Sequence, residues 1–255
     1  MSFEACAALV EKADPLRFRA AMATPVPARR TLFPLYAFNI EVARAPWVTE
    51  EPMIAEMRLQ WWRDALEEIA EGKTVRRHEV VDALAGVLDP QATRCLDGLI
   101  AARRWDIYKD PFEDAAHFDD YINATSGHLM WTAARLLGEA QEDVVRDFAY
   151  GVGIANMFQA IPALDAQNRK PLMDKSPAGV AALASKALGR LDRAKAARKS
   201  VSNQAGAGLI AGYHARPILQ MALTAPDRVA QDALDMNPAR DSLRFLNVSL
   251  RGWWR

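Results

Sequence analysis

Hydrophobic residues recur at helical spacing along almost the whole chain. Between residues 50 and 71 the repeat is every four residues. The repeating residues are Met53, Met57, Trp61, Ala65 and Ile69, with Leu59, Trp62 and Leu66 beside them. This spacing places side chains on one side of an α-helix, so it predicts a helix with a broad buried face. Thr49 is expected to cap the helix and Gly72 to end it, and the acidic residues 50–51 suit its first turn.

Capping residues followed directly by proline mark further helix starts. They are Asp14–Pro15, Asp89–Pro90, Ser176–Pro177 and Asn237–Pro238. The polar side chain accepts hydrogen bonds from free backbone N–H groups, and proline suits the first helical position. Gly138 and Pro162 are expected to end helices, and residues 163–176 to form the one long loop.

These signals predict helices near 3–12, 15–23, 27–45, 50–71, 78–88, 90–108, 114–137, 141–161, 177–200, 203–222, 226–235 and 238–254. No segment alternates between apolar and polar residues as a half-buried strand does. The chain is therefore predicted to be all-α, with residues 1–255 forming a single domain.

Composition narrows the class of protein. The chain has 255 residues, 51% of them hydrophobic, which is enough for one large core. Its formal net charge is zero, so the overall charge does not indicate a nucleic-acid partner. Cys6 and Cys95 match no redox or metal motif and are interpreted as core thiols in a reducing compartment. No segment is long enough for a transmembrane helix and none resembles a secretory signal, so we expect a cytoplasmic protein.

Two charged segments and the C-terminal residues are candidate contact surfaces. Residues 106–120 carry a net charge of −5 and residues 186–199 one of +5, typical of solvated helix faces or of docking surfaces. The C-terminal helix has apolar positions at Leu243, Leu246, Leu250 and Trp253, with Trp254 next to them, and cationic positions at Arg240, Arg244, Arg251 and Arg255. It either packs on the core or binds a partner or an anionic membrane, which would make the protein peripheral on the inner membrane.

Other motifs give little indication of catalysis. The histidines are scattered without metal-ligand spacing. DxxxD pairs at Asp106–Asp110, Asp110–Asp114 and Asp143–Asp147 are interpreted as solvated helix ends. Glycines at 151, 153, 206, 208 and 212 are interpreted as close helix contacts, because no strand precedes them as in a dinucleotide-binding site.

The segments Tyr36-Ala37-Phe38 and Arg58-Leu59-Gln60-Trp61-Trp62-Arg63 resemble the signature of the squalene/phytoene synthase superfamily. Enzymes of this superfamily carry a DxxxD motif just after Tyr-Ala-Phe and a second Asp-rich motif on a later helix. Here the aspartates of the first motif would fall at Ala43 and Trp47, which we call the first metal station. Those of the second would fall near Leu164 and Asn168, the second metal station, with Asp165 out of register.

The resemblance has a chemical consequence. Ionising an allylic diphosphate requires Mg²⁺, a hard ion that binds carboxylate and phosphate oxygens. Neither station offers a carboxylate, so no cofactor is expected, and Mg²⁺ belongs only to an enzymatic alternative.

The segment from Ala37 to Ala43 narrows the resemblance to one branch of the superfamily. It is similar to the corresponding stretch of a non-catalytic branch. That branch contains a mitochondrial complex I assembly factor and alphaproteobacterial relatives. Residues 121–127, 136–138 and 168–172 also fit superfamily motifs, so the resemblance spans about residues 14–173. It implies an isoprenoid-synthase-like helical bundle around a central apolar cavity.

Three hypotheses follow. The leading one is a non-catalytic protein that assists the assembly of respiratory complex I; the others are a prenyltransferase that uses displaced acidic residues and an isoprenoid or lipid carrier. The candidate cavity or partner residues are Tyr36, Asn39, Glu41, Arg58, Trp61, Trp62, Tyr121, Asn156, Gln159 and Arg169. Trp61 and Trp62 fit either core packing or the wall of a prenyl tunnel. Glu41 fits either an ion pair with Arg29, Arg30 or Arg58, or binding of a cation or a partner.

Overall fold

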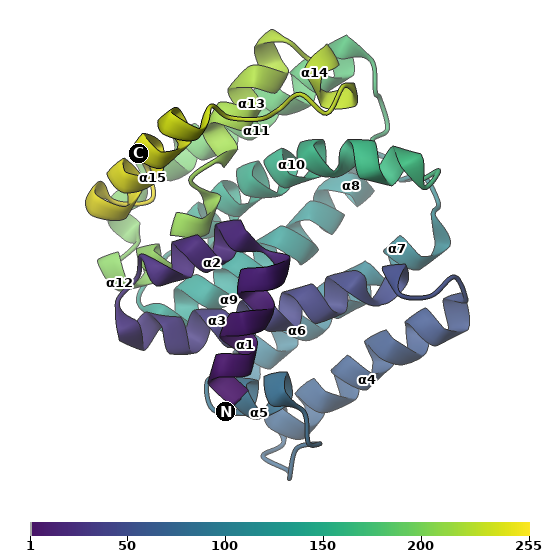
Figure 1. Cartoon of the computed structure of the whole chain (residues 1–255), viewed down its shortest axis with the longest axis vertical. Coiled ribbons are helices and arrows are strands. Elements are labelled where there is room, and N and C mark those ends of the chain that lie inside the picture. The colour runs from purple at the N-terminus through teal and green to yellow at the C-terminus, as the bar shows by residue number, and fades with distance from the viewer. Residues whose placement is uncertain (1) are drawn as a thin grey trace.

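The computed structural model describes residues 2–255, which form α-helices joined by short connections (Figure 1). The first half contains α1 (Ser2–Ala13), α2 (Pro15–Met22), α3 (Val26–Arg44), η1 (Ala45–Trp47), α4 (Pro52–Ala70), α5 (Glu79–Ala85), α6 (Pro90–Arg103) and α7 (Trp105–Tyr108). The second half contains α8 (Ala115–Ile122), η2 (Asn123–Gly127), α9 (His128–Leu137), α10 (Glu142–Ala166), α11 (Pro177–Ala196), η3 (Arg198–Ser200), α12 (Asn203–Ala207), η4 (Ile210–Gly212), α13 (Ala215–Thr224), α14 (Asp227–Ala230) and α15 (Pro238–Arg251). The described residues include no β-strand, and the all-α prediction is confirmed.

The four predicted cap–proline starts are all confirmed. In each case the capping side chain accepts a hydrogen bond from the backbone of the first turn. The caps are Asp14 for α2, Asp89 for α6, Ser176 for α11 and Asn237 for α15. Local sequence therefore determines where these helices begin.

Two hydrophobic cores hold the helices together. One is built mainly from α1 to α6 and includes Phe38 and Leu99, while the other is built mainly from α8 to α13 and includes Phe158 and Ile218. Helix α10 crosses the middle of the molecule in Figure 1 and packs against α9, α11 and α13. Its buried apolar residues, among them Val152 and Phe158, belong to the core of the second half.

Helix α10 continues through Pro162 and ends at Ala166, so the prediction that Pro162 ends the helix is wrong. Proline in a helix interior removes one backbone hydrogen bond. The buried Phe158 and Ile161, in the turn that precedes Pro162, hold the helix in place. Tertiary packing outweighs the local signal, and the long loop is confined to residues 167–176.

Residues 203–222 were predicted as one helix, but they form α12, η4 and the first part of α13. The interruption lies where the chain passes close to α10. A β-carbon on Gly212 would lie 2.4 Å from Val152 Cγ2 and 2.7 Å from Phe148 Cε1. This confirms the interpretation of Gly212 as a close contact. Two other predicted helices are also interrupted: residues 90–108 form α6 and α7, and a π-helix separates α8 from α9.

Helix α4 buries only part of the broad face predicted for it. Met53 and Met57 are 75% and 65% exposed, and the buried positions are Ala55, Leu59, Trp62, Ala65 and Leu66. All of these except Ala55 belong to the predicted face, and helix α4 packs against α6. The ring centre of Trp62 lies 5.5 Å from the ring centre of Phe38 on α3, and the flexible methionines remain outside.

The start of α4 also differs from the prediction. The helix begins at Pro52, so Glu50 and Glu51 precede its first turn. The Thr49 hydroxyl accepts a hydrogen bond from the Glu51 backbone at 3.2 Å but does not cap the helix itself. Gly72 has φ +64° just beyond the last turn and ends the helix as predicted.

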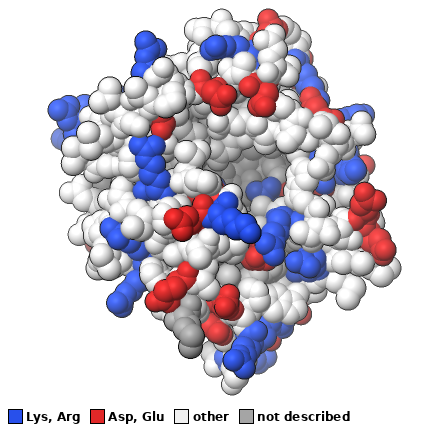
Figure 2. Space-filling view, in the orientation of Figure 1, with Lys and Arg blue, Asp and Glu red and all other residues white. Residues whose placement is uncertain are grey.

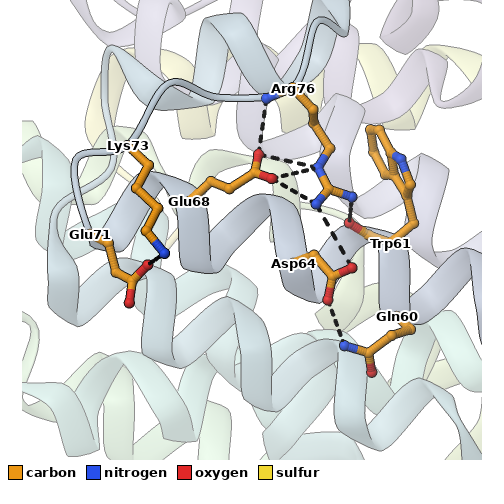
Figure 3. Close-up of polar contacts among 7 residues, drawn as sticks. All are labelled: Gln60, Trp61, Asp64, Glu68, Glu71, Lys73 and Arg76. Carbon is orange, nitrogen blue, oxygen red and sulfur yellow. Dashed lines mark hydrogen bonds and ion pairs between the residues drawn. The ribbon is translucent and has the colours of Figure 1, made fainter.

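A polar network covers the outer side of α4 (Figure 3). Arg76, from the segment after the helix, forms an ion pair with Glu68 at 2.7 Å and donates to the Trp61 carbonyl at 3.0 Å. Its guanidinium also lies 4.9 Å from the ring centre of Trp61. Trp61 is therefore half-buried beneath a cation, while its neighbour Trp62 belongs to the core.

Replacing Trp62 by alanine is expected to lower the free energy of unfolding by about 3–5 kcal/mol, because a large buried ring is lost and a cavity remains. Met57→Ala on the exposed side of the same helix is the matched control, with an expected change within about 0.5 kcal/mol. Urea denaturation followed by circular dichroism measures both. Equal effects of the two substitutions would show that the buried face of α4 is misassigned.

Candidate functional site

A pocket of about 220 Å³ lies between the two cores and is lined by residues of both. Its apolar walls include Trp105, Leu129 and Met157. Its charged lining consists of Arg17, Arg103, Lys109, Arg169 and Lys170, with Asp106 and Asp110. In the orientation of Figure 1, Figure 2 shows a hollow with Lys and Arg side chains around it and Asp and Glu side chains beside them. The predicted central cavity is therefore present, and cations as well as apolar groups line it.

The first metal station contains an aromatic–cation contact. Trp47, at the end of η1, lines the pocket, and the guanidinium of Arg169 lies 4.6 Å from its ring centre. Arg169 is only 8% exposed, and it donates a short hydrogen bond to the backbone carbonyl of Asp106. No carboxylate forms an ion pair with it among the described residues. A buried cation here would repel Mg²⁺.

The second metal station likewise offers no carboxylate to the pocket. Leu164 lines the cavity, while Asn168 is exposed and has φ +58°. The nearby Asp165 is exposed and forms an ion pair with Lys175. Across residues 2–255, no three His, Cys, Asp or Glu side chains lie close enough to hold a metal ion. The donor set therefore does not fit a Mg²⁺ cluster.

Asp106 is the buried acid of the pocket. Its carboxylate accepts from the Tyr121 hydroxyl at 2.8 Å and from Arg103 at 2.9 Å, and Arg103 also donates to the Tyr121 oxygen at 2.9 Å. Burial, together with the Asp106 charge, raises the pKa of Tyr121, which keeps the phenol protonated as the donor. The interpretation of Asp106 as part of a solvated helix end is wrong, whereas Asp110 is exposed in the connection after α7.

Asn156 reaches the pocket from α10 and is held by a buried histidine. His214 Nε2 lies 2.9 Å from Asn156 Oδ1. Burial lowers the pKa of His214 to about 4, so the ring is neutral near pH 7. A neutral ring protonated at Nε2 donates to the amide oxygen and fixes the orientation of Asn156.

The π-helix η2 forms one wall of the pocket. Thr125 donates from its hydroxyl to the Tyr121 carbonyl at 2.7 Å, and Ser126 donates to the Ala149 carbonyl at 2.9 Å. A β-carbon on Gly153 would lie 2.8 Å from Ile122 Cγ2, so glycine is needed where α10 approaches this wall. Single turns of π-helix are frequent at functional sites.

Four of the sequence-predicted residues line the pocket: Asn39, Tyr121, Asn156 and Arg169. Tyr36 is buried beside it, with Arg17 5.6 Å from its ring centre, and burial raises the pKa of Tyr36 to about 12. The fold brings these five side chains to the same region from α3, α8, α10 and the following loop.

The other predicted residues lie elsewhere. Arg58 and Gln159 are exposed, and neither Trp61 nor Trp62 lines the pocket. Glu41 forms an ion pair with Arg44 at 3.1 Å instead of one with Arg29, Arg30 or Arg58. The i, i+3 partner on its own helix is closer than the partners proposed from sequence.

Several lining residues were missed from sequence. They are Arg17, Arg103, Lys109, Lys170 and Trp105. A pattern of metal-ligating carboxylates does not mark cationic side chains. The sequence signal available was the Arg-Lys pair at 169–170, inside a segment that already matched the family pattern.

The segments of opposite charge are partly paired within the molecule. Lys186 forms an ion pair with Asp119, and Arg193 contacts Asp147 at 2.9 Å. Arg190 lies 4.0 Å from the ring centre of Tyr150. The basic segment on α11 is thus bound to its neighbours and leaves fewer free charges for docking than its sequence suggested.

The C-terminal helix α15 combines core packing with an exposed apolar stripe. Val248 is fully buried, and Trp253 packs on Phe148 with ring centres 4.8 Å apart. By contrast, Leu243, Leu246 and Leu250 are exposed, the last by 75%. The predicted apolar stripe is therefore only partly buried. Its leucines are exposed, while Trp253 is buried and holds the end of the chain against the core.

This fold is that of an isoprenoid synthase. A crystal structure of a dehydrosqualene synthase in complex with ligand superposes with a TM-score of 0.80 at 14% identity, covering 98% of this chain and 95% of that one. At that identity the likeness establishes the fold alone. The family model for squalene/phytoene synthase matches residues 10–173, and the chain therefore belongs to the squalene/phytoene synthase family.

Two relatives that are similar in sequence are named as complex I assembly factors and not as synthases. The chain is 27% identical over 166 residues to NADH dehydrogenase (ubiquinone) complex I, assembly factor 6 homolog of Drosophila melanogaster, covering 62% of this chain and 50% of the relative. It is 23% identical over 134 residues to the Homo sapiens assembly factor 6, covering 52% and 40%. The chain thus spans half or less of the length of these relatives.

Proposed function

We propose that the protein is a non-catalytic member of the family that assists the assembly of respiratory complex I. The observation that carries the proposal is the contact between Trp47 and Arg169 in the first metal station. It puts an aromatic ring and a buried cation where diphosphate ionisation requires carboxylates and Mg²⁺. The similarity to complex I assembly factor 6 of two animals supports the choice of process.

The alternative of an active prenyltransferase rests on Asp106 and Asp110, which both line the pocket. Asp106 already accepts hydrogen bonds from Tyr121 and Arg103, so its oxygens are less available to bind a metal ion. Asp110 alone would leave a single free carboxylate, and two metal stations require more. The non-catalytic proposal is therefore preferred, and the two differ in a measurable way.

With farnesyl diphosphate and Mg²⁺, isothermal titration calorimetry is expected to show no Mg²⁺-dependent binding in the micromolar range. The reason is the missing carboxylates at both stations. The same titration with EDTA in place of Mg²⁺ is the control for metal dependence. Micromolar affinity that appears only with Mg²⁺ would contradict the non-catalytic proposal and favour the prenyltransferase.

Deleting the gene in its own organism is expected to lower the amount of assembled complex I, measured by native gel electrophoresis with an NADH-dehydrogenase stain. Complementation with the wild-type gene should restore it, and succinate dehydrogenase, which does not depend on complex I, serves as the internal control. An unchanged level of complex I in the deletion strain would reject the assembly role.

We further propose that the protein acts at the surface of the inner membrane through α15. Within residues 2–255, no helix is long and apolar enough to cross a membrane. Leu243, Leu246 and Leu250 form an exposed stripe, and Arg240 and Arg251 are exposed on the same helix. An apolar stripe with cations beside it suits the interface of an anionic bilayer.

The triple variant Leu243→Gln/Leu246→Gln/Leu250→Gln is expected to bind about tenfold or more weakly to vesicles of phosphatidylcholine and phosphatidylglycerol. Each leucine lost removes apolar area that would enter the bilayer. Co-sedimentation measures binding, and Met53→Gln/Met57→Gln, on an equally exposed part of α4, is the control. If both variants bind like the wild type, or if the wild type does not bind, α15 is not a membrane contact.

A further inference from the structure

The charge of the central pocket is the opposite of what a metal site requires. Five cationic and two acidic side chains line about 220 Å³ of space. One of the acids, Asp106, is held by Arg103 and Tyr121. The uncompensated charge facing the pocket is therefore positive.

Arg169 is a buried cation of the pocket with no ion-pair partner among the described residues. It is more than nine-tenths buried, its guanidinium donates to the Asp106 carbonyl and lies over the ring of Trp47, and its Nε has no hydrogen-bond partner among the described residues. Burying a cation without a paired anion costs several kcal/mol. An anionic group that enters the pocket would remove much of that cost.

Lys109 and Lys170 extend the same positive surface towards the opening. Both are exposed, and neither has an ion-pair partner among the described residues. Lys109 has φ +59°, and Asn168, which precedes the Arg169–Lys170 pair, has φ +58°. Both backbone turns thus lie in segments that contribute cations to the pocket. Left-handed residues other than glycine are uncommon and cluster at binding sites.

The rest of the wall is apolar. Ile122, Leu129, Met157 and Leu164 line the space beside the cations. Ligand pockets usually measure about 300–1,000 Å³, so this one suits a head group and a short length of chain. The rest of a longer chain would extend out of the pocket through its opening.

From these observations we propose that the pocket binds, without a divalent metal, the phosphate end of a single-chain amphiphile, with Arg169, Lys109 and Lys170 in place of the metal. Guanidinium and ammonium groups are strong donors to phosphate oxygens. The proposal rests on the non-catalytic function proposed above, since it assigns the pocket to binding alone. Mg²⁺ is expected to weaken the complex or leave it unchanged, because the ion competes with the protein for the phosphate.

Calorimetry in EDTA tests the proposal, with geranyl monophosphate and a short-chain lysophosphatidic acid as two probes. Binding of either supports it, and the tighter probe identifies an isoprenoid or a glycerolipid source. Geraniol is the control without phosphate. The Lys109→Gln/Lys170→Gln variant keeps the buried residues intact and is expected to bind about tenfold or more weakly, as for hydrogen bonds to charged groups. Arg58→Gln, an exposed arginine away from the pocket, should bind like the wild type.

The outcomes separate the two proposals. Absence of binding in EDTA, equal binding of geraniol, or unchanged affinity of the double lysine variant would overturn the anion site and leave the non-catalytic role standing. Binding that requires Mg²⁺ would overturn both. Arg169→Met, provided that circular dichroism shows it folded, should also lose affinity; unchanged binding by a folded Arg169→Met protein would overturn the role assigned to Arg169.

Discussion

The structure depends on the close approach of other helices to α10. Gly151, Gly153 and Gly212 lie at three of these contacts, and a β-carbon at any of them would come within 2.8 Å of a neighbouring side chain. Without those contacts α11, η2 and the segment after α12 could not pack where they do. The same packing places Asn156 and Leu164 of α10 in the pocket. The shape of the site therefore follows from small residues that take no part in its chemistry.

Much of the fold could be predicted from local signals. A capping side chain and a proline determine a helix start by themselves, so the position of Asp89 in the sequence was enough. Pro162 shows the limit, because packing around Phe158 outweighs one lost hydrogen bond. Helix α4 shows a second limit of local signals. The spacing predicts one broad apolar face, and only packing against neighbouring helices decides that Trp62 is buried and Met57 exposed.

The site was predictable only in part. Tyr121 and Arg169 lie in segments that fit the family pattern, and the empty metal stations could be found by counting residues from a motif. The cations were harder to predict, because Arg17 and Lys109 come from segments distant in sequence that meet only after folding. The Asp106 cluster shows the same effect: an acid in a charged segment is usually solvated, and burial became evident only with Tyr121 and Arg103 around it.

The stacking of Arg169 on Trp47 also affects how the chain could change over evolutionary time. An aspartate introduced at position 47 would lie beside a buried guanidinium with no anionic partner. The new carboxylate would form an ion pair with Arg169 before it could bind a metal. Restoring metal binding would thus require coordinated replacements in η1 and in the loop after α10, each unfavourable alone. Under the non-catalytic role proposed above, the contact between Arg169 and Trp47 would therefore oppose the appearance of a metal site at this position.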